Sequence, residues 1–433
     1  MNITDFFNSD IKDYSVYACQ RAIPSGVDGL KPSQRKVLFG MRKEYPSTET
    51  EVKVSIASAS IMGVSAYHHG SLDQVVVGLA QNFPGTNNVP LLDGIGQFGN
   101  RISPVAAASR YIFTRLSKPA QKLFNSEDDH ILEWLNEEGQ SIEPNFYIPL
   151  LPIVLINGAS GMGTGYATNI LQYNPDKIRL AMIDYLSGKT HKPLVPWFNG
   201  YTGSVEKVDS QWVISGKLEV INSTTVKITE LPIGVNSIKY RDTLNSLEDK
   251  GVIKSYDDNS SDVKIEFIVT TPRETTKLNH DKLMTTFKLV SRETETIVVW
   301  NENGAIVTFD STDELLHWFT DYRLKRISDR ISWIIESTSK ELQWIREQIK
   351  FIEFFKLNGK RLLDLPQDKI KVEIEQAGFK SIDRLLSIKI GNLNSEYKDK
   401  LKSTEINLQD KVDYHSTVDH TEYMIKELKE LKL

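Results

Sequence analysis

Apolar residues recur at steps of three and four from Leu315 to Ile352, the longest regular pattern in the chain. This spacing places them on one face of a helix. Thr312 precedes the pattern as a helix cap, and no proline or glycine interrupts it before Gly359. A helix of this length without internal caps predicts a coiled coil. We expect shorter helices at 367–377, 380–387, 393–405 and 415–431, which supply a globule and the returning helix of the coil.

Between about residues 170 and 310 the pattern changes to short apolar runs of the kind that form strands. Asn303-Gly304 lies between two such runs and predicts a β-hairpin. The mixture of strands and helices predicts an α/β domain. The expected strands are at 203–208, 211–215, 218–221, 225–230, 263–269 and 296–300, and the expected helices are at 236–249 and 278–288.

The first part of the chain favours compact helices. Residues 11–45 predict two helices around a Pro/Gly turn at 23–32, and residues 52–83 predict two more, broken at Gly63 and at 67–71. A Gly-rich strand–turn segment follows at 90–99. This succession suits a winged helix with its docking helix near 71–82. The apolar run Val154–Ile156 predicts a strand that leads into a Gly-rich loop at 157–165.

Composition indicates a globular protein of about three domains, with 433 residues, 40% apolar and 25% charged. The net charge of −5 would not by itself suggest a nucleic-acid partner. The charges are segregated, however: cations concentrate before residue 120 and acidic residues after it. A cationic groove on an acidic body fits this asymmetry.

Cys19 is the one cysteine, which excludes an intrachain disulfide and a zinc site built from cysteines. We therefore expect a reducing compartment, the cytoplasm. The N-terminus does not resemble a signal peptide. The apolar run Ile148–Ile156 contains two prolines and is too short to span a bilayer, so we expect no membrane partner.

Residues 105–116 contain the strongest catalytic candidate. Tyr111 follows Arg110 directly, and Arg115 lies close behind. A tyrosine hydroxyl is a weak nucleophile at neutral pH unless nearby cations stabilise its oxyanion. Arginine supplies that field, and its planar fork also suits phosphate oxygens. The stretch predicts attack on a phosphodiester. The plainer alternative is that Tyr111 is a packing residue beside an alanine-rich run.

Other cations precede this stretch. Lys31, Arg35 and Lys36 begin a helix after the Pro/Gly turn, where they either contact a phosphate backbone or form the solvated face of an amphipathic helix. His68 and His69 stand before a helix N-terminus, where phosphate binds well. A zinc site is disfavoured there because no further ligands follow at metal-site spacing.

The Gly-rich loop 157–165 does not end in Gly-Lys-Ser/Thr, so a nucleotide site is disfavoured. Its glycines allow close approach of the backbone to a ligand. Met162 within it is an apolar tip of the kind that can wedge between base steps and kink a duplex.

These segments together resemble the DNA breakage–reunion part of type IIA DNA topoisomerases, along nearly the whole chain. The resemblance rests on motifs in family order, and several neighbourhoods look closer to the eukaryotic enzymes than to bacterial gyrase. The motifs are Arg21–Pro24, Asp28–Leu38, Tyr67–Gly70, Leu79–Phe83, Leu91–Gly94, Gln97–Arg101, Ala106–Tyr111 and Asn157–Asn169.

The resemblance implies an α+β multidomain fold: a winged-helix DNA-cleavage domain with an N-terminal arm (1–165), an α/β tower domain (166–310), and a long antiparallel coiled coil with a helical C-gate globule (311–433). It implies a 5′-phosphotyrosyl intermediate and strand passage. The implied catalytic residues are Tyr111, Arg110, His69 and Arg21. The implied DNA-binding residues are Lys31, Arg35, Lys36, His68, Arg101 and, as an intercalating wedge, Met162.

The resemblance also implies partners. The sequence shows neither an ATPase fold nor an acidic TOPRIM-type motif, and its extent resembles the separate breakage subunit of phage enzymes in this family. We expect a large subunit that holds Mg²⁺ and hydrolyses ATP, with no metal ligands in this chain, a homodimer through the C-gate and the winged-helix region, and double-stranded DNA as substrate. Two alternatives stay open: an architectural protein that bends DNA without chemistry, and an inhibitor or decoy subunit of another topoisomerase.

Overall fold

The computed structural model describes residues 3–433, with all side chains except those of Asp5, Asn8 and Ile390. The chain divides into two compact units. The first comprises residues up to Arg323 together with 427–433, and the second comprises 324–426. This is an α+β multidomain fold, as predicted. The three-domain division at residues 165 and 310 stays a prediction.

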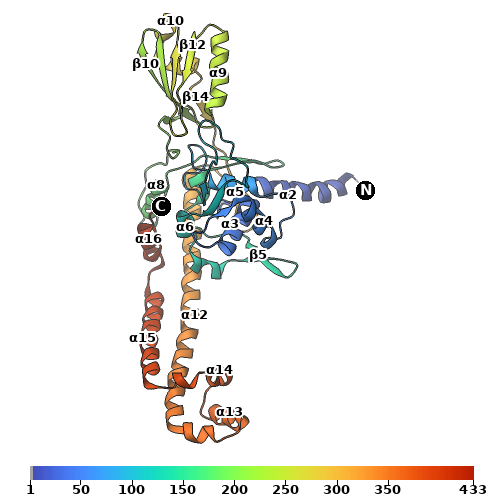
Figure 1. Cartoon of the computed structure of the whole chain (residues 1–433), viewed down its shortest axis with the longest axis vertical. Coiled ribbons are helices and arrows are strands. Elements are labelled where there is room, and N and C mark those ends of the chain that lie inside the picture. The colour runs from blue at the N-terminus through green and yellow to red at the C-terminus, as the bar shows by residue number, and fades with distance from the viewer. Residues whose placement is uncertain (1–2) are drawn as a thin grey trace. The chain divides into compact units, whose positions relative to one another are not determined.

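A winged helix lies in the first unit. Three helices pack on a small antiparallel sheet of strand order β1-β3-β2, and Figure 1 shows α3, α4 and α5 gathered together. Val37, Leu38, Ile61 and Val76 are buried between them. The elements are α3 (Pro32–Glu44), α4 (Val54–Val64), α5 (Asp73–Ala80), β1 (Val52–Lys53), β2 (Leu92–Ile95) and β3 (Phe113–Leu116).

Other short elements flank the winged helix. They are α1 (Ile3–Phe6), the π-helical turn η1 (Phe7–Ile11), α2 (Lys12–Ala22), α6 (Lys118–Leu123), the 3₁₀ turn η2 (Ser126–Ile131), and the paired strands β4 (Trp134–Glu137) and β5 (Gln140–Pro144).

The strand predicted at Val154–Ile156 is wrong, because these residues lie in the short helix α7 (Ile153–Asn157). All of its residues from Ile153 to Ile156 are buried. A short, fully buried apolar run has no polar face, so its periodicity does not distinguish a helix from a strand. The Gly-rich segment after it forms an antiparallel hairpin of β6 (Ala159–Met162) and β7 (Ala167–Ile170).

A second sheet in the first unit has the strand order β10-β11-β13-β12, and α9 runs alongside it (Figure 1). Val226, Ile228 and Phe267 of the sheet pack with Leu244 and Leu283 of the helices in one core. We call this the β10–β13 module. Its elements are β10 (Lys217–Asn222), β11 (Thr225–Glu230), α9 (Ser237–Asp249), β12 (Ser255–Asp258), β13 (Phe267–Thr270), α10 (Arg273–Thr276) and α11 (His280–Thr286).

The strands and helices predicted between 203 and 300 are found close to their expected positions, and the Asn303-Gly304 turn connects a hairpin as predicted. The strand predicted at 263–269 begins later, at Phe267. The remaining elements of this region are α8 (Pro175–Leu186), the sheet of β8 (Ser204–Val208), β9 (Gln211–Ser215) and β14 (Val290–Glu293), and the hairpin of β15 (Ile297–Trp300) and β16 (Ile306–Phe309).

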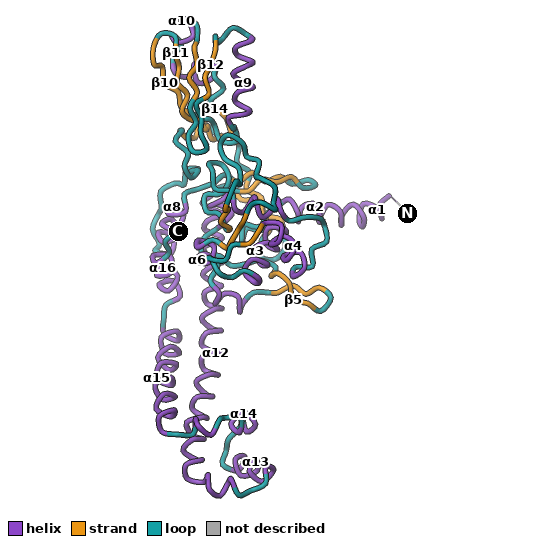
Figure 2. Tube along the Cα trace, viewed as in Figure 1, coloured by secondary structure: helices purple, strands orange, loops and turns teal. Residues whose placement is uncertain are grey.

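The long helix α12 (Thr312–Leu363) begins in the first unit and continues through the second. Figure 2 shows α15 (Ser395–Thr417) running beside it. Ile345, Ile349 and Ile352 of α12 pack on Leu401 of α15, as expected for a coiled coil. The globule comprises α13 (Gln367–Gln376), α14 (Ile382–Leu386) and the turn η3 (Ile390–Asn392), and α16 (His420–Glu430) follows α15.

Two helices in this part are longer than the sequence pattern indicates. The helix α12 passes through Gly359, where the ring of Phe355 covers the glycine. A helical glycine costs only about 1 kcal/mol, which such packing can offset. The helix predicted at 393–405 extends to Thr417 and is itself the returning helix. Within residues 3–433, no helix is both long and apolar enough to cross a membrane.

Candidate active site

Tyr111 lies in a turn directly before β3, on the loop that joins β2 to β3. Its side chain is 68% exposed. The guanidinium of Arg110 lies over its ring, with the Arg110 Cζ 4.9 Å from the ring centroid. The Tyr111 amide donates to the carbonyl of Ala108 at 2.9 Å, which closes the turn. An exposed tyrosine in contact with a cation can reach a large polyanionic substrate, whereas a packing tyrosine would be buried.

The β2–β3 loop is held by contacts of its own. The amide of Ala107 donates to the carbonyl of Gln97 at 2.9 Å. The side-chain amide of Gln81, directly after α5, donates to the carbonyls of Phe98 and Pro104 at 2.8 and 3.0 Å. The two sides of the loop are therefore joined before the chain reaches Tyr111. Gln81 belongs to a family motif, but nothing in its local sequence pattern indicates this role.

Arg115 does not serve Tyr111 in the way the sequence indicated. It donates to Asp93 at 3.0 Å and lies 3.6 Å from Glu51. The hydrogen bond with Asp93 raises the pKa of Arg115 above its usual value. Arg115 thus pairs with Asp93 on β2 and with Glu51 directly before β1, and Arg110 is the arginine that contacts the tyrosine.

His69 and Arg21 are both exposed. The ring of His69 packs edge-on against Tyr67, with centroids 5.8 Å apart. Arg21, in the last turn of α2, lies over the ring of Tyr17. Neither contact involves Tyr111, so the structure brings Arg110 to the tyrosine and leaves the roles of His69 and Arg21 as predictions. His68 is also exposed.

Three of the predicted DNA-binding cations are engaged in ion pairs within the protein, so their contact with DNA stays a prediction. Arg35 pairs with Asp28 at 2.6 Å and is 8% exposed. Lys36 pairs with Glu143 at 2.7 Å, and Arg101 pairs with Glu230 in a largely buried contact. A cation that is desolvated and neutralised within the protein does not release counterions from DNA.

Lys31 differs from these three. Its ammonium donates to the carbonyl of Ser160 on β6 at 2.8 Å, a contact on the protein surface. Partial burial lowers its pKa from the usual value. The predicted DNA contact of Lys31 is compatible with this placement and lies beside the β6–β7 hairpin.

Met162 projects from the end of β6 with 86% of its surface exposed. The hairpin below it sits tightly on α2, because a Cβ at Gly161 would overlap the carbonyl oxygen of Ala22 and one at Gly163 would overlap Cys19. A solvent-exposed methionine on a firmly seated hairpin has the form expected of a wedge.

The described residues do not by themselves fit a metal centre. Within residues 3–433, the structure contains no group of three or more His, Cys, Asp or Glu side chains that could hold a metal ion. The Gly-rich segment pairs as two strands instead of cradling a phosphate at a helix N-terminus. We therefore assign no reaction step in this chain to Mg²⁺ or ATP.

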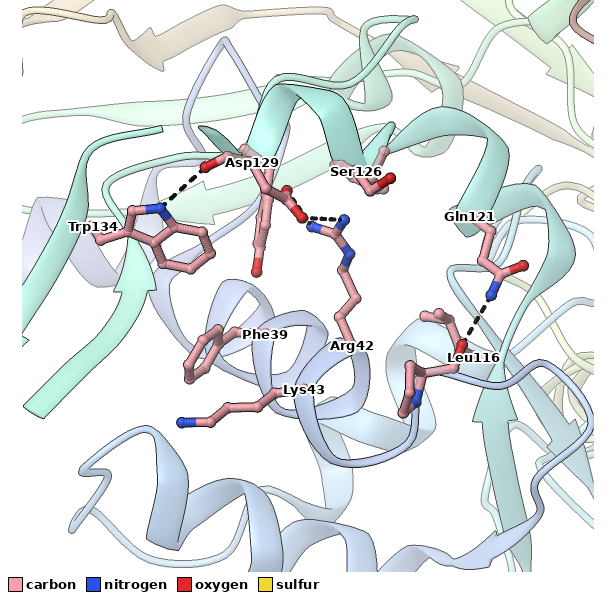
Figure 3. A pocket seen from close by; sticks show the side chains of 11 residues that line it. Phe39, Arg42, Lys43, Leu116, Gln121, Ser126, Asp129 and Trp134 are labelled. Carbon is pink, nitrogen blue, oxygen red and sulfur yellow. Dashed lines mark hydrogen bonds and ion pairs between the residues drawn. The ribbon is translucent and has the colours of Figure 1, made fainter. Parts of the chain in front are cut away.

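A hollow of about 580 Å³ lies beside the C-terminal half of α3 (Figure 3). Arg42 donates to both carboxylate oxygens of Asp129 at 2.9 Å, and the indole of Trp134 donates to the Asp129 carbonyl at 3.2 Å. Burial raises the pKa of the Asp129 carboxyl despite this pairing. The residues that line this hollow include none of the predicted site residues. The candidate active site therefore lies elsewhere, on the exposed β2–β3 loop.

Known proteins resemble the chain in both sequence and fold. The family model for the A-subunit of DNA gyrase/topoisomerase IV matches residues 21–430. Mitochondrial DNA topoisomerase 2 of Dictyostelium discoideum is 34% identical over 419 residues, covering 92% of this chain and 32% of the relative. Human DNA topoisomerase 2-alpha is 36% identical over 396 residues, covering 88% of this chain and 26% of the relative.

The crystal structure of the DNA-binding, cleavage and re-ligation domain of Plasmodium falciparum topoisomerase II superposes with a TM-score of 0.91 at 31% identity, covering 98% of this chain and 63% of that one. The fold is thus that of a type II topoisomerase cleavage core. The chain belongs to the family of the DNA gyrase/topoisomerase IV A-subunit. It spans about a third, or less, of the length of these curated relatives.

Proposed function

We propose that this chain breaks and rejoins duplex DNA through Tyr111. The Tyr111 oxygen attacks a backbone phosphorus and forms a 5′-phosphotyrosyl bond, while the bond from phosphorus to the 3′ oxygen breaks. The tyrosine loses its proton and the 3′ oxygen gains one. The reverse reaction reseals the strand without a separate energy source, since the phosphodiester energy is kept in the protein–DNA bond.

The observation that supports this proposal is the placement of Tyr111: exposed, under the guanidinium of Arg110, on a loop of a winged helix. Arg110 stabilises the charge that develops on the tyrosine oxygen and the phosphate. His69 and Arg21 act on the same phosphate in our proposal. Both are exposed, whereas Arg35 and Arg101 are buried against carboxylates.

The DNA surface in this proposal includes Lys31, His68 and Met162. Lys31 contacts a backbone phosphate near the β6–β7 hairpin, and His68 contacts one near the start of α5. Met162 enters the base stack and bends the duplex, since its side chain is apolar and almost fully exposed. None of these contacts reads base identity, which suits an enzyme that acts at many sites.

Type IIA topoisomerases use Mg²⁺ and ATP. We propose that a large partner subunit, with TOPRIM and ATPase domains, supplies both in the cytoplasm of the cell or of a phage-infected host. Two copies of this chain would associate through the globule of the second unit and through the winged-helix region. A second duplex then passes through the break, and DNA is relaxed or untangled.

The test is covalent trapping. The chain is mixed with its candidate large subunit, plasmid DNA and Mg²⁺, quenched with detergent, and analysed for protein bound to DNA 5′ ends. The wild type should form this complex and Tyr111→Phe should not. Tyr14→Phe is a matched control, because Tyr14 is also 68% exposed, and it should behave as the wild type does.

A covalent complex that persists in Tyr111→Phe would show that another residue is the nucleophile. If neither protein forms a complex while both bend DNA equally, the architectural function replaces the proposed one. Met162 is the residue that favours that second candidate, since a wedge bends DNA without chemistry.

A further inference from the structure

The β2–β3 loop reaches from the winged helix to the β10–β13 module. Its tip, residues 100–102, lies against that module, and its second half leads to Tyr111. The loop therefore makes a direct physical connection between the sheet of the winged helix and the sheet of the β10–β13 module.

The main contact at the tip is the pair of Arg101 with Glu230, the last residue of β11. Arg101 is 7% exposed and Glu230 is 4% exposed. The guanidinium also donates to the carbonyl of Leu231 at 3.2 Å. The other oxygen of Glu230 accepts from the amide and hydroxyl of Thr202 at 3.0 and 2.9 Å. The ion pair is thus desolvated and fixed on both sides.

Two further bonds join the tip to the module. The side-chain amide of Asn100 donates to Asp262 at 2.8 Å. The amide of Ser237, the first residue of α9, donates to the carbonyl of Arg101 at 3.0 Å. The Arg101 residue is therefore held by its backbone and its side chain to different elements of one module.

The connection continues from the tip to the tyrosine. The Gln81 side chain joins Phe98 to Pro104, and the Ala107–Gln97 bond closes the loop behind them. Only the closed turn at Ala108 separates this clamp from Tyr111. Hydrogen bonds thus form a continuous path from the tip of the loop to the turn that carries Tyr111.

We propose that Arg101 is a positioning residue for Tyr111, which it keeps in register with the β10–β13 module through Glu230. The inference rests on the proposed function and adds a role that the sequence does not indicate, since the family resemblance implies DNA binding by Arg101. DNA that moves the module also moves the tyrosine, so cleavage is coupled to the shape of the bound duplex.

The first test separates positioning from binding. In Arg101→Gln, the single-turnover rate of covalent complex formation at saturating DNA should fall about 10- to 100-fold, the cost of a small misplacement. The dissociation constant for the same duplex should change less than about twofold, because Arg101 does not face DNA. Arg101→Lys retains the charge opposite Glu230 and should recover most of the rate.

Arg323→Gln is the matched control. Arg323 is 1% exposed and donates to both oxygens of Asp128 at 3.0 and 2.8 Å. Its loss removes a buried ion pair from the same unit without touching the β2–β3 loop. Its cleavage rate should stay close to that of the wild type among folded molecules. An equal fall in both variants, or an unchanged rate in Arg101→Gln, would overturn the inference.

Hydrogen exchange supplies a readout that does not require cleavage. The amides of Ala107 and Tyr111 should exchange at least about tenfold faster in Arg101→Gln than in the wild type, because their loop loses its anchor. Unchanged exchange at both amides refutes the positioning role. If the wild type forms no covalent complex, the proposed function fails instead, and this measurement still decides whether Arg101 orders the loop.

Discussion

Replacing Arg35 by glutamine should destabilise the first unit and leave DNA binding intact. The Arg35 guanidinium donates to both oxygens of Asp28 at 2.6 and 3.0 Å and to the carbonyl of Leu30 at 3.0 Å. Asp28 is fully buried and also accepts from the amides of Leu30 and Tyr147. The variant leaves this carboxylate buried without its cation.

The expected cost follows from that loss. Breaking a buried ion pair by removing one partner costs about 3–5 kcal/mol. Burial works against the charge of Arg35, but the attraction and hydrogen bonds of Asp28 outweigh it and raise the pKa of Arg35 above its usual value. Arg35 therefore keeps its charge near neutrality, and the full cost should be observed there.

Urea denaturation followed by tryptophan fluorescence measures this cost. With a slope of about 3 kcal/mol per M, the midpoint should fall by about 1–1.7 M. Asp176→Asn is the control, because Asp176 pairs with Arg179 at the surface and its side chain is 77% exposed. Such surface pairs contribute only about 0–1 kcal/mol.

DNA affinity measured at several salt concentrations tests the other half of the prediction. The slope of log K against log salt should not change in Arg35→Gln, whereas Lys31→Gln should reduce its magnitude by about one. The reasoning is refuted if Arg35→Gln unfolds at the wild-type midpoint, or if it reduces the salt slope as Lys31→Gln does.

Two other substitutions test separate contacts. Gly161→Ala should displace the β6–β7 hairpin from α2, destabilise the fold by about 1–3 kcal/mol, and reduce the DNA bend as Met162→Ala does, measured by energy transfer between labels on the DNA ends. The control is Gly63→Ala, whose new methyl group meets open space and should stabilise its helix by about 0.5–1 kcal/mol. An undiminished DNA bend in Gly161→Ala would contradict the argument that the hairpin is tightly packed on α2. Glu347 is partly desolvated, which opposes its charge, but hydrogen bonds from Ser381 and Lys380 prevail and hold its pKa below the usual value. A depressed carboxyl pKa stabilises the folded state at pH values above the unfolded-state pKa of about 4.3, and this stabilisation is lost as the pH falls through the folded-state pKa. Protection of the Ser381 amide from hydrogen exchange should therefore decline in acid in the wild type and should not depend on pH in this way in Glu347→Gln. Identical pH profiles of exchange in the two proteins would refute this prediction.

The contrast between Tyr111 and Arg35 shows what local sequence can predict. Tyr111 is a candidate nucleophile in the sequence because Arg110 precedes it directly and because both belong to the Ala106–Tyr111 motif. The structure shows the expected contact between the two side chains. The Asn303-Gly304 hairpin and the coiled-coil helix also depend on nearby residues, and both are found. Turn chemistry and helical periodicity are short-range properties, which a single sequence displays directly.

Arg101 shows where this reasoning stops. Its partner Glu230 is 129 positions away in the chain, and no local pattern indicates that the two side chains meet. A cation in a basic stretch looks the same in sequence whether it faces solvent, DNA or a distant carboxylate. Burial of ion pairs depends on tertiary packing, and for that reason the predicted DNA surface contained residues that the fold turns inward.

The rate at which Cys19 reacts with a thiol reagent can report on opening of the β6–β7 hairpin. Its thiol is 3% exposed, donates to the carbonyl of Thr164 at 3.4 Å, and lies directly beneath Gly163. Lifting of the hairpin tip would uncover this thiol to a reagent, and no second cysteine adds to the signal. The labelling rate of Cys19 in the wild-type chain thus reports how often the hairpin that carries Met162 separates from α2. A slower labelling rate in the presence of DNA would show that insertion of Met162 into the duplex holds the hairpin in place.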